Sequence, residues 1–131
     1  MTAPEVRLVE EWHEALNGGD SERLVDLSQP DVEMSGPRGT VYGTQIPREW
    51  VDRASIRLVL RRVFHASSAV VVEQEAAWTS ADTGESTPPQ TVASVFAVRG
   101  GRVASVVRYV GLAAALRAAG LDGPQEEAGP P

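Results

Sequence analysis

Hydrophobic residues in the first part of the chain recur every three or four positions, which is the spacing of one helix face. They predict a helix over residues 3–17, with an apolar stripe formed by Val6, Val9, Trp12 or His13, and Leu16. Thr2 and Glu5 have the spacing of a capping box and mark the start of this helix. Two glycines at positions 18 and 19 then end it, because glycine readily adopts the left-handed conformation that follows a helix.

Three shorter helices are predicted elsewhere. Asp20 is a good N-cap for the first of them, and Pro30 ends it because proline cannot donate a backbone hydrogen bond. The next runs over residues 46–53, since Pro47 suits the first turn of a helix. The last covers residues 112–119 and is closed by a glycine at position 120.

The hydrophobic period changes to two after residue 56, as in strands with one buried face. In residues 70–79 the set predicted to face the core is Val70, Val72, Gln74, Ala76 and Trp78. The residues between them are expected to face mostly water. One long strand with a buried and an exposed side is therefore predicted here.

Turn residues predict two hairpins. Residues 32–35 and 40–42 flank a Gly-Pro-Arg-Gly turn, and residues 91–98 and 103–110 flank Gly100-Gly101, which supplies the positive φ of a tight turn. Helices followed by strands are typical of an α+β fold, in which helices cover one face of an antiparallel sheet. We expect this fold class, with the helices closing over a curved sheet.

Length and composition fit one domain. The chain has 131 residues, of which 42% are hydrophobic and 23% charged, which is enough for one core and too little for two. We assign residues 1–121 to the domain and residues 122–131, which are acidic and rich in proline and glycine, to a disordered tail. The chain has no cysteine, which excludes disulfides and thiol chemistry.

The net charge of the chain limits the classes of partner that we expect it to bind. The net charge of −6 argues against nucleic acid, because binding to phosphates needs a dense basic face. The chain has only two histidines, and they do not have the spacing of a metal-binding motif. We therefore expect no metal site and no cofactor. No apolar stretch is long enough to cross a bilayer, and the acidic start is unlike a secretory signal. We therefore expect a cytoplasmic protein with no membrane partner.

Several stretches of the chain, taken in order, are similar to one known family. They are WHEALNGGD at residues 12–20, PDVE at residues 30–33 leading to Gly43, and GRV at residues 101–103 leading to RY at residues 108–109. Their order resembles the nuclear-transport-factor-2-like superfamily, in particular its SnoaL-like branch, which also holds ketosteroid isomerases and limonene-epoxide hydrolases. The resemblance covers roughly residues 5–120. It implies a cone-shaped domain, with three N-terminal helices packed on a strongly curved antiparallel sheet, an internal pocket and frequent dimerisation.

The resemblance also implies where catalytic groups of those enzymes would stand. The phenol, the base and the acid of the isomerases fall on Trp12, Met34 and Ser94. Met34 cannot take a proton, so isomerase chemistry of that type is disfavoured. The two aspartates and the arginine of the hydrolases fall on or near Arg108, Gln74 and Ala76, which lack both the acid and the base. Hydrolysis by that mechanism is disfavoured too.

Arg108 is the main candidate for a ligand contact. By strand alternation it lies on the same side as apolar residues, where an unpaired guanidinium is costly. It can bind the carboxylate, enolate or phosphate of a ligand. The alternatives are an outer-face position or an internal ion pair, for which the candidate carboxylates are Glu33, Glu75 and Asp26.

Aromatic residues favour an apolar ligand, although they can also simply fill the core. The predicted ligand-binding set is Trp12, Met34, Trp50, Gln74, Trp78, Ser94 and Arg108. His13 and His65 are candidate bases, and no catalytic residue is assigned. We expect a homodimer that binds a small, largely apolar metabolite. Two alternatives remain open: an isomerase, cyclase or hydrolase acting on such a metabolite, and a non-catalytic dimerisation domain.

Overall fold

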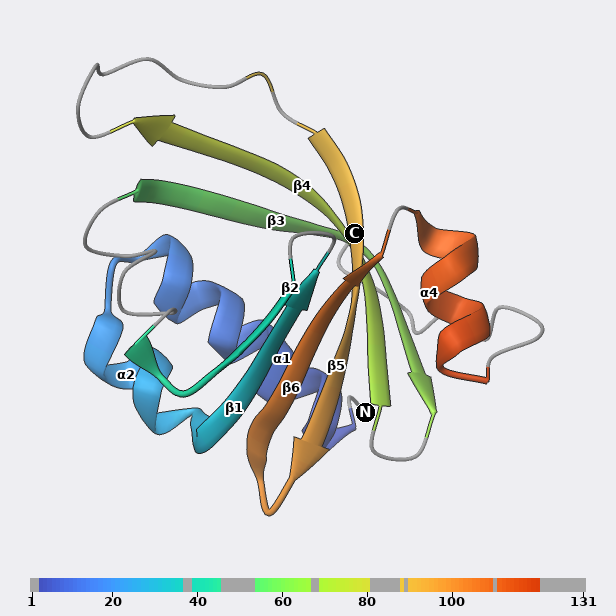
Figure 1. The fold of residues 1–131 in the computed structure, drawn as a ribbon, viewed down its shortest axis with the longest axis horizontal. Helices are drawn as coiled ribbons and strands as arrows, with labels where there is room; N and C mark the ends of the chain where they lie inside the picture. The colour runs from blue at the N-terminus through green and yellow to red at the C-terminus, as the bar shows by residue number, and fades with distance from the viewer. Residues whose placement is uncertain are drawn as a thin grey trace.

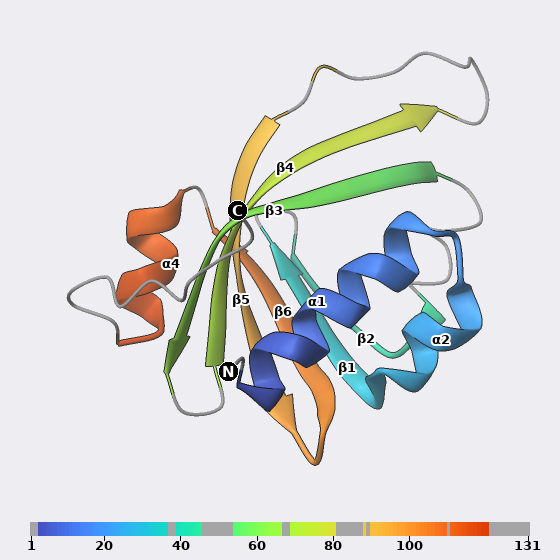
Figure 2. The same ribbon diagram turned by 180° about the vertical axis from the view of Figure 1, so that it is seen from behind.

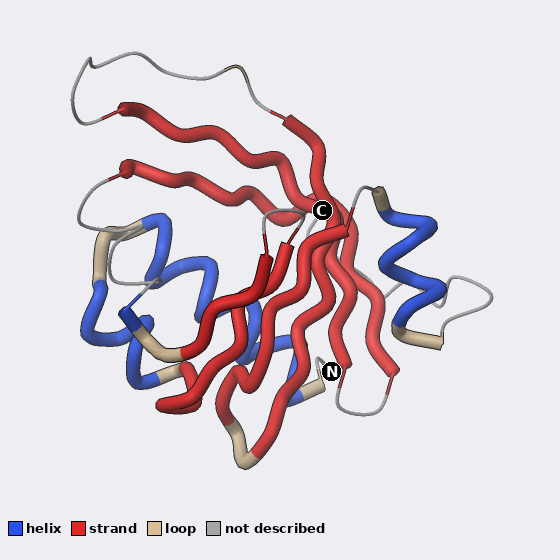
Figure 3. The backbone as a smooth tube through the Cα atoms, viewed as in Figure 1, coloured by secondary structure: helices blue, strands red, loops and turns tan. Residues whose placement is uncertain are grey.

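A computed structural model describes residues 3–36, 39–45, 54–66, 69–80, 88, 90–109 and 111–120. Six strands form one curved sheet in the order β2-β1-β6-β5-β4-β3 (Figure 1). The strands are β1 (Ser28–Gly36), β2 (Gly39–Tyr42), β3 (Ala54–Ala66), β4 (Ala69–Ser80), β5 (Gln90–Arg99) and β6 (Arg102–Tyr109). The long strands β3 and β4 bend strongly along their length (Figure 3).

Neighbouring strands are antiparallel except β1 and β6, which are parallel. The prediction of a wholly antiparallel sheet is wrong at this one pair. The other pairs are joined along the chain, either by hairpins or by the connection from β4 to β5. β1 and β6 are separated by residues 37–101, so no turn fixes their relative direction.

The described part of the chain contains three helices: α1 (Pro4–Asn17), α2 (Ser21–Asp26) and α4 (Leu112–Ala118). α1 crosses one face of the sheet with α2 beside it, and α4 lies on the opposite face (Figure 2). We call the face covered by α1 the inner face and the face covered by α4 the outer face. The helix predicted over residues 46–53 and the tail at residues 122–131 lie outside the described residues.

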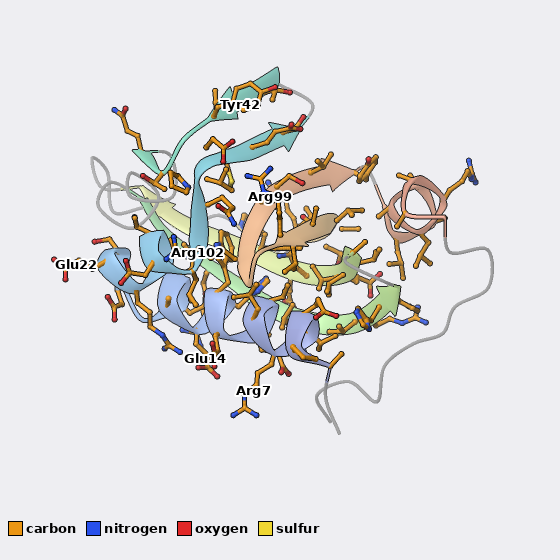
Figure 4. All side chains as sticks on the ribbon, turned by 90° about the horizontal axis from the view of Figure 1, so that it is seen from below. Arg7, Glu14, Glu22, Tyr42, Arg99 and Arg102 are labelled. Carbon is orange, nitrogen blue, oxygen red and sulfur yellow. The ribbon has the colours of Figure 1, made fainter. Side chains whose placement is uncertain are left out.

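α1 packs on the inner face through the apolar stripe that its sequence predicts. The stripe and the strands below it form the main core, which includes Val9, Trp12, Leu16, Val32, Met34, Val63, Val70, Val72, Phe96 and Val106. Arg7 and Glu14 point from α1 away from the sheet (Figure 4). The end of α1 is tied to the edge strand β3, because the Asn17 side chain donates to Leu58 O over 2.8 Å and accepts from Leu58 N over 2.9 Å.

The helix ends differ from the sequence prediction in two places. α1 is capped at Ala3 without a side-chain bond, so the capping box at Thr2 is wrong, and Glu5 instead pairs with a histidine on β3. Asp20 caps α2 as predicted, accepting a bond from Arg23 N. α2 nevertheless ends before Pro30, which lies within β1. The register of β1 is irregular at Pro30. The missing N–H of the proline therefore removes no regular hydrogen bond between the strands.

The longer hairpin confirms its turn prediction. Gly100 and Gly101 both have positive φ, 61° and 76°, and join β5 to β6. A register shift near this turn buries Val103 on the same core as Val106, whereas strict alternation from Arg108 predicts Ala104 there. The short hairpin between β1 and β2 is confirmed as well.

The alternation predicted along β4 is confirmed on the inner face. Val70, Val72, Gln74 and Ala76 are all buried there, and the side chain of Trp78 lies outside the described part. The opposite face departs from the prediction at Val71, which is buried instead of facing water. α4 covers it, in a second apolar cluster that also contains Phe64, Ala93 and Ala115.

Candidate functional site

One row of residues crosses the inner face between the two edges of the sheet. Register places Val63 opposite Val72, Val72 opposite Ser94, and Ser94 opposite Arg108. Residues directly opposite each other point to the same face. The row therefore changes from apolar to polar to charged as it approaches β1.

Two glycines complete this row beyond Arg108. A Cβ atom placed on Gly36 would lie 3.7 Å from the Cβ of Arg108, so the two positions are neighbours on one face. Gly36 is in turn paired with Gly39 of β2. On the β1 side, the Arg108 side chain thus has no side chain beside it in the row.

A buried chain of hydrogen bonds lies under α1 on the other side of Arg108. Ser94 Oγ donates to Gln74 Oε1 over 3.0 Å, and Gln74 Nε2 lies 2.7 Å from His13 Nε2. His13 Nδ1 lies 2.7 Å from the carbonyl oxygen of Val9. All three polar side chains are at most 3% exposed.

The Val9 carbonyl fixes the direction of this chain. A carbonyl only accepts, so His13 Nδ1 carries the proton and donates it to Val9 O. Burial lowers the pKa of His13 to about 4, so the ring is neutral near pH 7 and its Nε2 accepts from the Gln74 amide. Both ring nitrogens are occupied and the ring is a weak base. His13 is therefore poorly suited to proton abstraction.

Arg108 is half-buried on this face. Desolvation lowers the pKa of its guanidinium, which means that the charge is held at a cost. Among the residues that the structure describes, no carboxylate lies within ion-pairing distance of it. Of the three internal partners that the sequence suggests, Glu75 pairs with Arg61, and neither Asp26 nor Glu33 reaches Arg108.

Trp12 and Met34 also lie on the inner face, as members of the main core. Trp12 is fully buried, donates from Nε1 to Ser28 Oγ over 3.1 Å and packs against Phe96 with the two rings in a T-shaped arrangement. Met34 is opposite Val106. Trp50 lies outside the described residues.

His65 is engaged elsewhere. Its Nε2 lies 3.0 Å from Glu5 Oε1, which joins β3 to the first turn of α1. This contact lies next to the N-terminal end of α1, and His65 is paired with Val70 in the register. We assign it a structural role.

The structure thus brings Trp12, Met34, Gln74, Ser94 and Arg108 of the predicted ligand-binding set onto one face. The sequence prediction missed the glycines beside Arg108, because a glycine in a hairpin reads as a turn residue. Within the described ranges no cluster of three or more potential metal ligands occurs. None of the described helices is long and apolar enough to span a membrane.

Solved structures share this fold. A "putative polyketide cyclase" from Xanthomonas campestris superposes with a TM-score of 0.69 at 20% identity, over 85% of this chain and 93% of that one. A hypothetical protein with a ketosteroid isomerase-like fold from Catenulispora acidiphila, in complex with trimethylamine, gives 0.66 at 19% identity, over 87% and 92%. TerC, co-crystallised with polyporic acid, gives 0.69 at 19% identity, over 86% and 95%.

At these identities the likeness shows the fold alone. No curated protein matches the chain. The family model of the SnoaL-like domain, however, matches residues 9–106, which is most of the sequence and includes the larger part of α1 and nearly the whole sheet. The chain belongs to the SnoaL-like domain family.

Proposed function

We propose that the inner face binds a small, largely apolar metabolite whose acidic group is held by Arg108. The observation that carries this proposal is a half-buried guanidinium, on a face whose other buried side chains are apolar or uncharged, with no carboxylate partner among the described side chains. A desolvated cation is stabilised strongly by an anion that it can bind in a fork. In the family resemblance this face is the inside of a cone, and we place the ligand there.

Binding is favoured over catalysis by the same residues. Ser94 and Gln74 do not titrate, and His13 is a weak base with both ring nitrogens occupied. Among the described inner-face residues we therefore find no suitable general base beside Arg108. The cyclase name of one structural neighbour supports a second candidate, an isomerase, cyclase or hydrolase in which Arg108 stabilises a developing oxyanion.

The test uses two probes of nearly equal shape, 2-naphthoate and its uncharged amide. The intact protein is expected to bind the acid more tightly than the amide. Arg108→Gln should weaken binding of the acid by about ten- to one-hundred-fold, because it removes a charge-assisted hydrogen bond worth about 1.5–3 kcal/mol. Binding of the amide should hardly change. Fluorescence titration of both probes measures this.

The same variant also separates a ligand contact from a structural ion pair. Since no described carboxylate would be left without its partner, the free energy of unfolding should change by less than about 1 kcal/mol. A loss of about 3–5 kcal/mol would instead indicate a buried partner for Arg108. Equal affinity of the intact protein and Arg108→Gln for 2-naphthoate would contradict the proposal.

We further propose that the protein is a homodimer, because α4 covers only part of the outer face and leaves apolar residues such as Ala97 and Val107 partly exposed there. Sedimentation at micromolar concentration should give about twice the 14.0 kDa mass of the chain. A single monomeric species at tens of micromolar would contradict this. A dimer that binds no acid would favour the third function, a non-catalytic dimerisation domain.

A further inference from the structure

We propose that Gly36 determines which acids the inner face accepts, by leaving the β1 side of Arg108 open to a flat apolar body such as that of an aromatic carboxylate. This inference rests on the proposed function. It adds the shape of the ligand and the residue that selects it.

The fold does not require glycine at position 36. Gly36 is not among the described glycines with positive φ, so its backbone conformation suits other residues. A Cβ atom there would meet the Cβ of Arg108 at 3.7 Å, which is ordinary van der Waals contact. Neither strain nor crowding therefore explains why this position has no side chain.

Gly39, unlike Gly36, is required by the backbone conformation of the hairpin. It is therefore not substituted in the experiment below. Its φ is 126°, a conformation that favours glycine, so the hairpin itself accounts for it. It still extends the open strip, because it is paired with Gly36 across the two strands.

The two glycines form a strip that lies beside Arg108, the only charged side chain of the row. Val63, Val72, Ser94 and Arg108 occupy the row from β3 to β6, and the two glycines follow on β1 and β2. Adjacent strands are about 4.8 Å apart, so the strip is about 10 Å wide. Gly36 is partly exposed and Gly39 is exposed, and a fused pair of aromatic rings is comparable in size to this strip.

The glycine strip favours a flat ligand over a globular one. A strip of glycine backbone without side chains presents a low surface, and dispersion contacts fall off steeply with distance. A flat ring touches such a surface over its whole face, whereas a globular body touches it at few atoms. Val41 of β2, which is opposite the buried Met34 and 44% exposed, gives the apolar end of the surface.

The experiment compares 2-naphthoate with adamantane-1-carboxylate, which has a globular body. The unmodified protein is expected to bind 2-naphthoate roughly tenfold more tightly. Gly36→Leu should weaken binding of 2-naphthoate by about tenfold or more, because the new side chain fills the strip, and Gly36→Ala should have a smaller effect. Calorimetric titration gives the dissociation constants, and circular dichroism checks the fold of each variant.

Ser35→Leu is the matched control, since it adds the same side chain to the neighbouring position of β1. Ser35 is opposite Val107 of β6 and so points to the other face from Arg108. This variant should bind 2-naphthoate like the unmodified protein. Equal weakening by Ser35→Leu and Gly36→Leu would overturn the inference, because it would show a general effect on the strand.

The two proposals fail in different ways. Binding that depends on Arg108 but is the same in Gly36→Leu, or that is equally tight for both acids, overturns the role of Gly36 alone. Binding that is unchanged in Arg108→Gln overturns the proposed function, and so does the absence of binding of either acid to the unmodified protein. If Gly36→Leu does not fold, the two acids are still compared on the unmodified protein. Equally tight binding of both acids would then overturn the proposed role of Gly36.

Discussion

Replacing Trp12 by alanine is expected to lower the free energy of unfolding by about 3–5 kcal/mol. Trp12 is fully buried in the contact between α1 and the sheet, with its ring centroid 5.2 Å from that of Phe96. Alanine would leave a cavity that the strands on the inner face cannot close, because they are held in register by their neighbours. Urea denaturation followed by circular dichroism measures the loss.

Trp12→Phe separates the ring from its hydrogen bond. It keeps an aromatic side chain against Phe96 but removes the donor to Ser28 Oγ. Ser28 retains its bond to Leu24 O, so no buried hydroxyl is left without a partner. The expected loss is therefore only about 1–2 kcal/mol. Equal losses in the two variants would show that the ring does not pack as described.

Acidification from pH 6.5 to pH 4 is expected to destabilise the protein by about 3 kcal/mol through His13 alone. The unfolded chain binds a proton at His13 below about pH 6.5, whereas in the folded protein burial lowers the pKa to about 4. Between these values the unfolded state binds more protons, so stability falls as the pH falls. The contribution of His13 is fully present above pH 6.5, and below pH 4 it changes no further.

His13→Phe is the control for this prediction. It removes the titrating group and leaves the Gln74 amide without that partner, which lowers stability by an amount that does not depend on pH. The carboxylates titrate alike in both proteins, so the difference between their pH profiles isolates His13. Urea denaturation at a series of pH values gives the profiles. Parallel profiles between pH 4 and 6.5 would exclude the buried neutral state of His13.

The sequence by itself determined the elements whose signals lie within a few residues. The apolar stripe of α1, the inward-facing positions along β4 and the turn at Gly100 and Gly101 were predicted and confirmed. These features depend on the period of one helix or strand and on the conformations that glycine allows. They need no knowledge of what lies across the sheet. The family, too, was identified from motifs that are each local.

Only the tertiary structure decided which distant residues meet. The parallel pairing of β1 with β6, and the burial of Val71 under α4, depend on contacts between segments far apart in the chain. The same is true of the bond between His13 and Gln74. No local period encodes such contacts, because a strand can pair in several registers and directions with similar local energies.

Arg108 shows both sides of this division. Strand alternation placed it on the apolar face, where the structure has it, next to Ser94. Alternation could not tell whether a carboxylate would meet it there, since Asp26, Glu33 and Glu75 were all plausible partners. The register decided that none of them does within the described residues, and that Gly36 lies beside it instead. The environment of a charged side chain is set by its neighbours across the strands, and those are fixed only when the whole sheet forms.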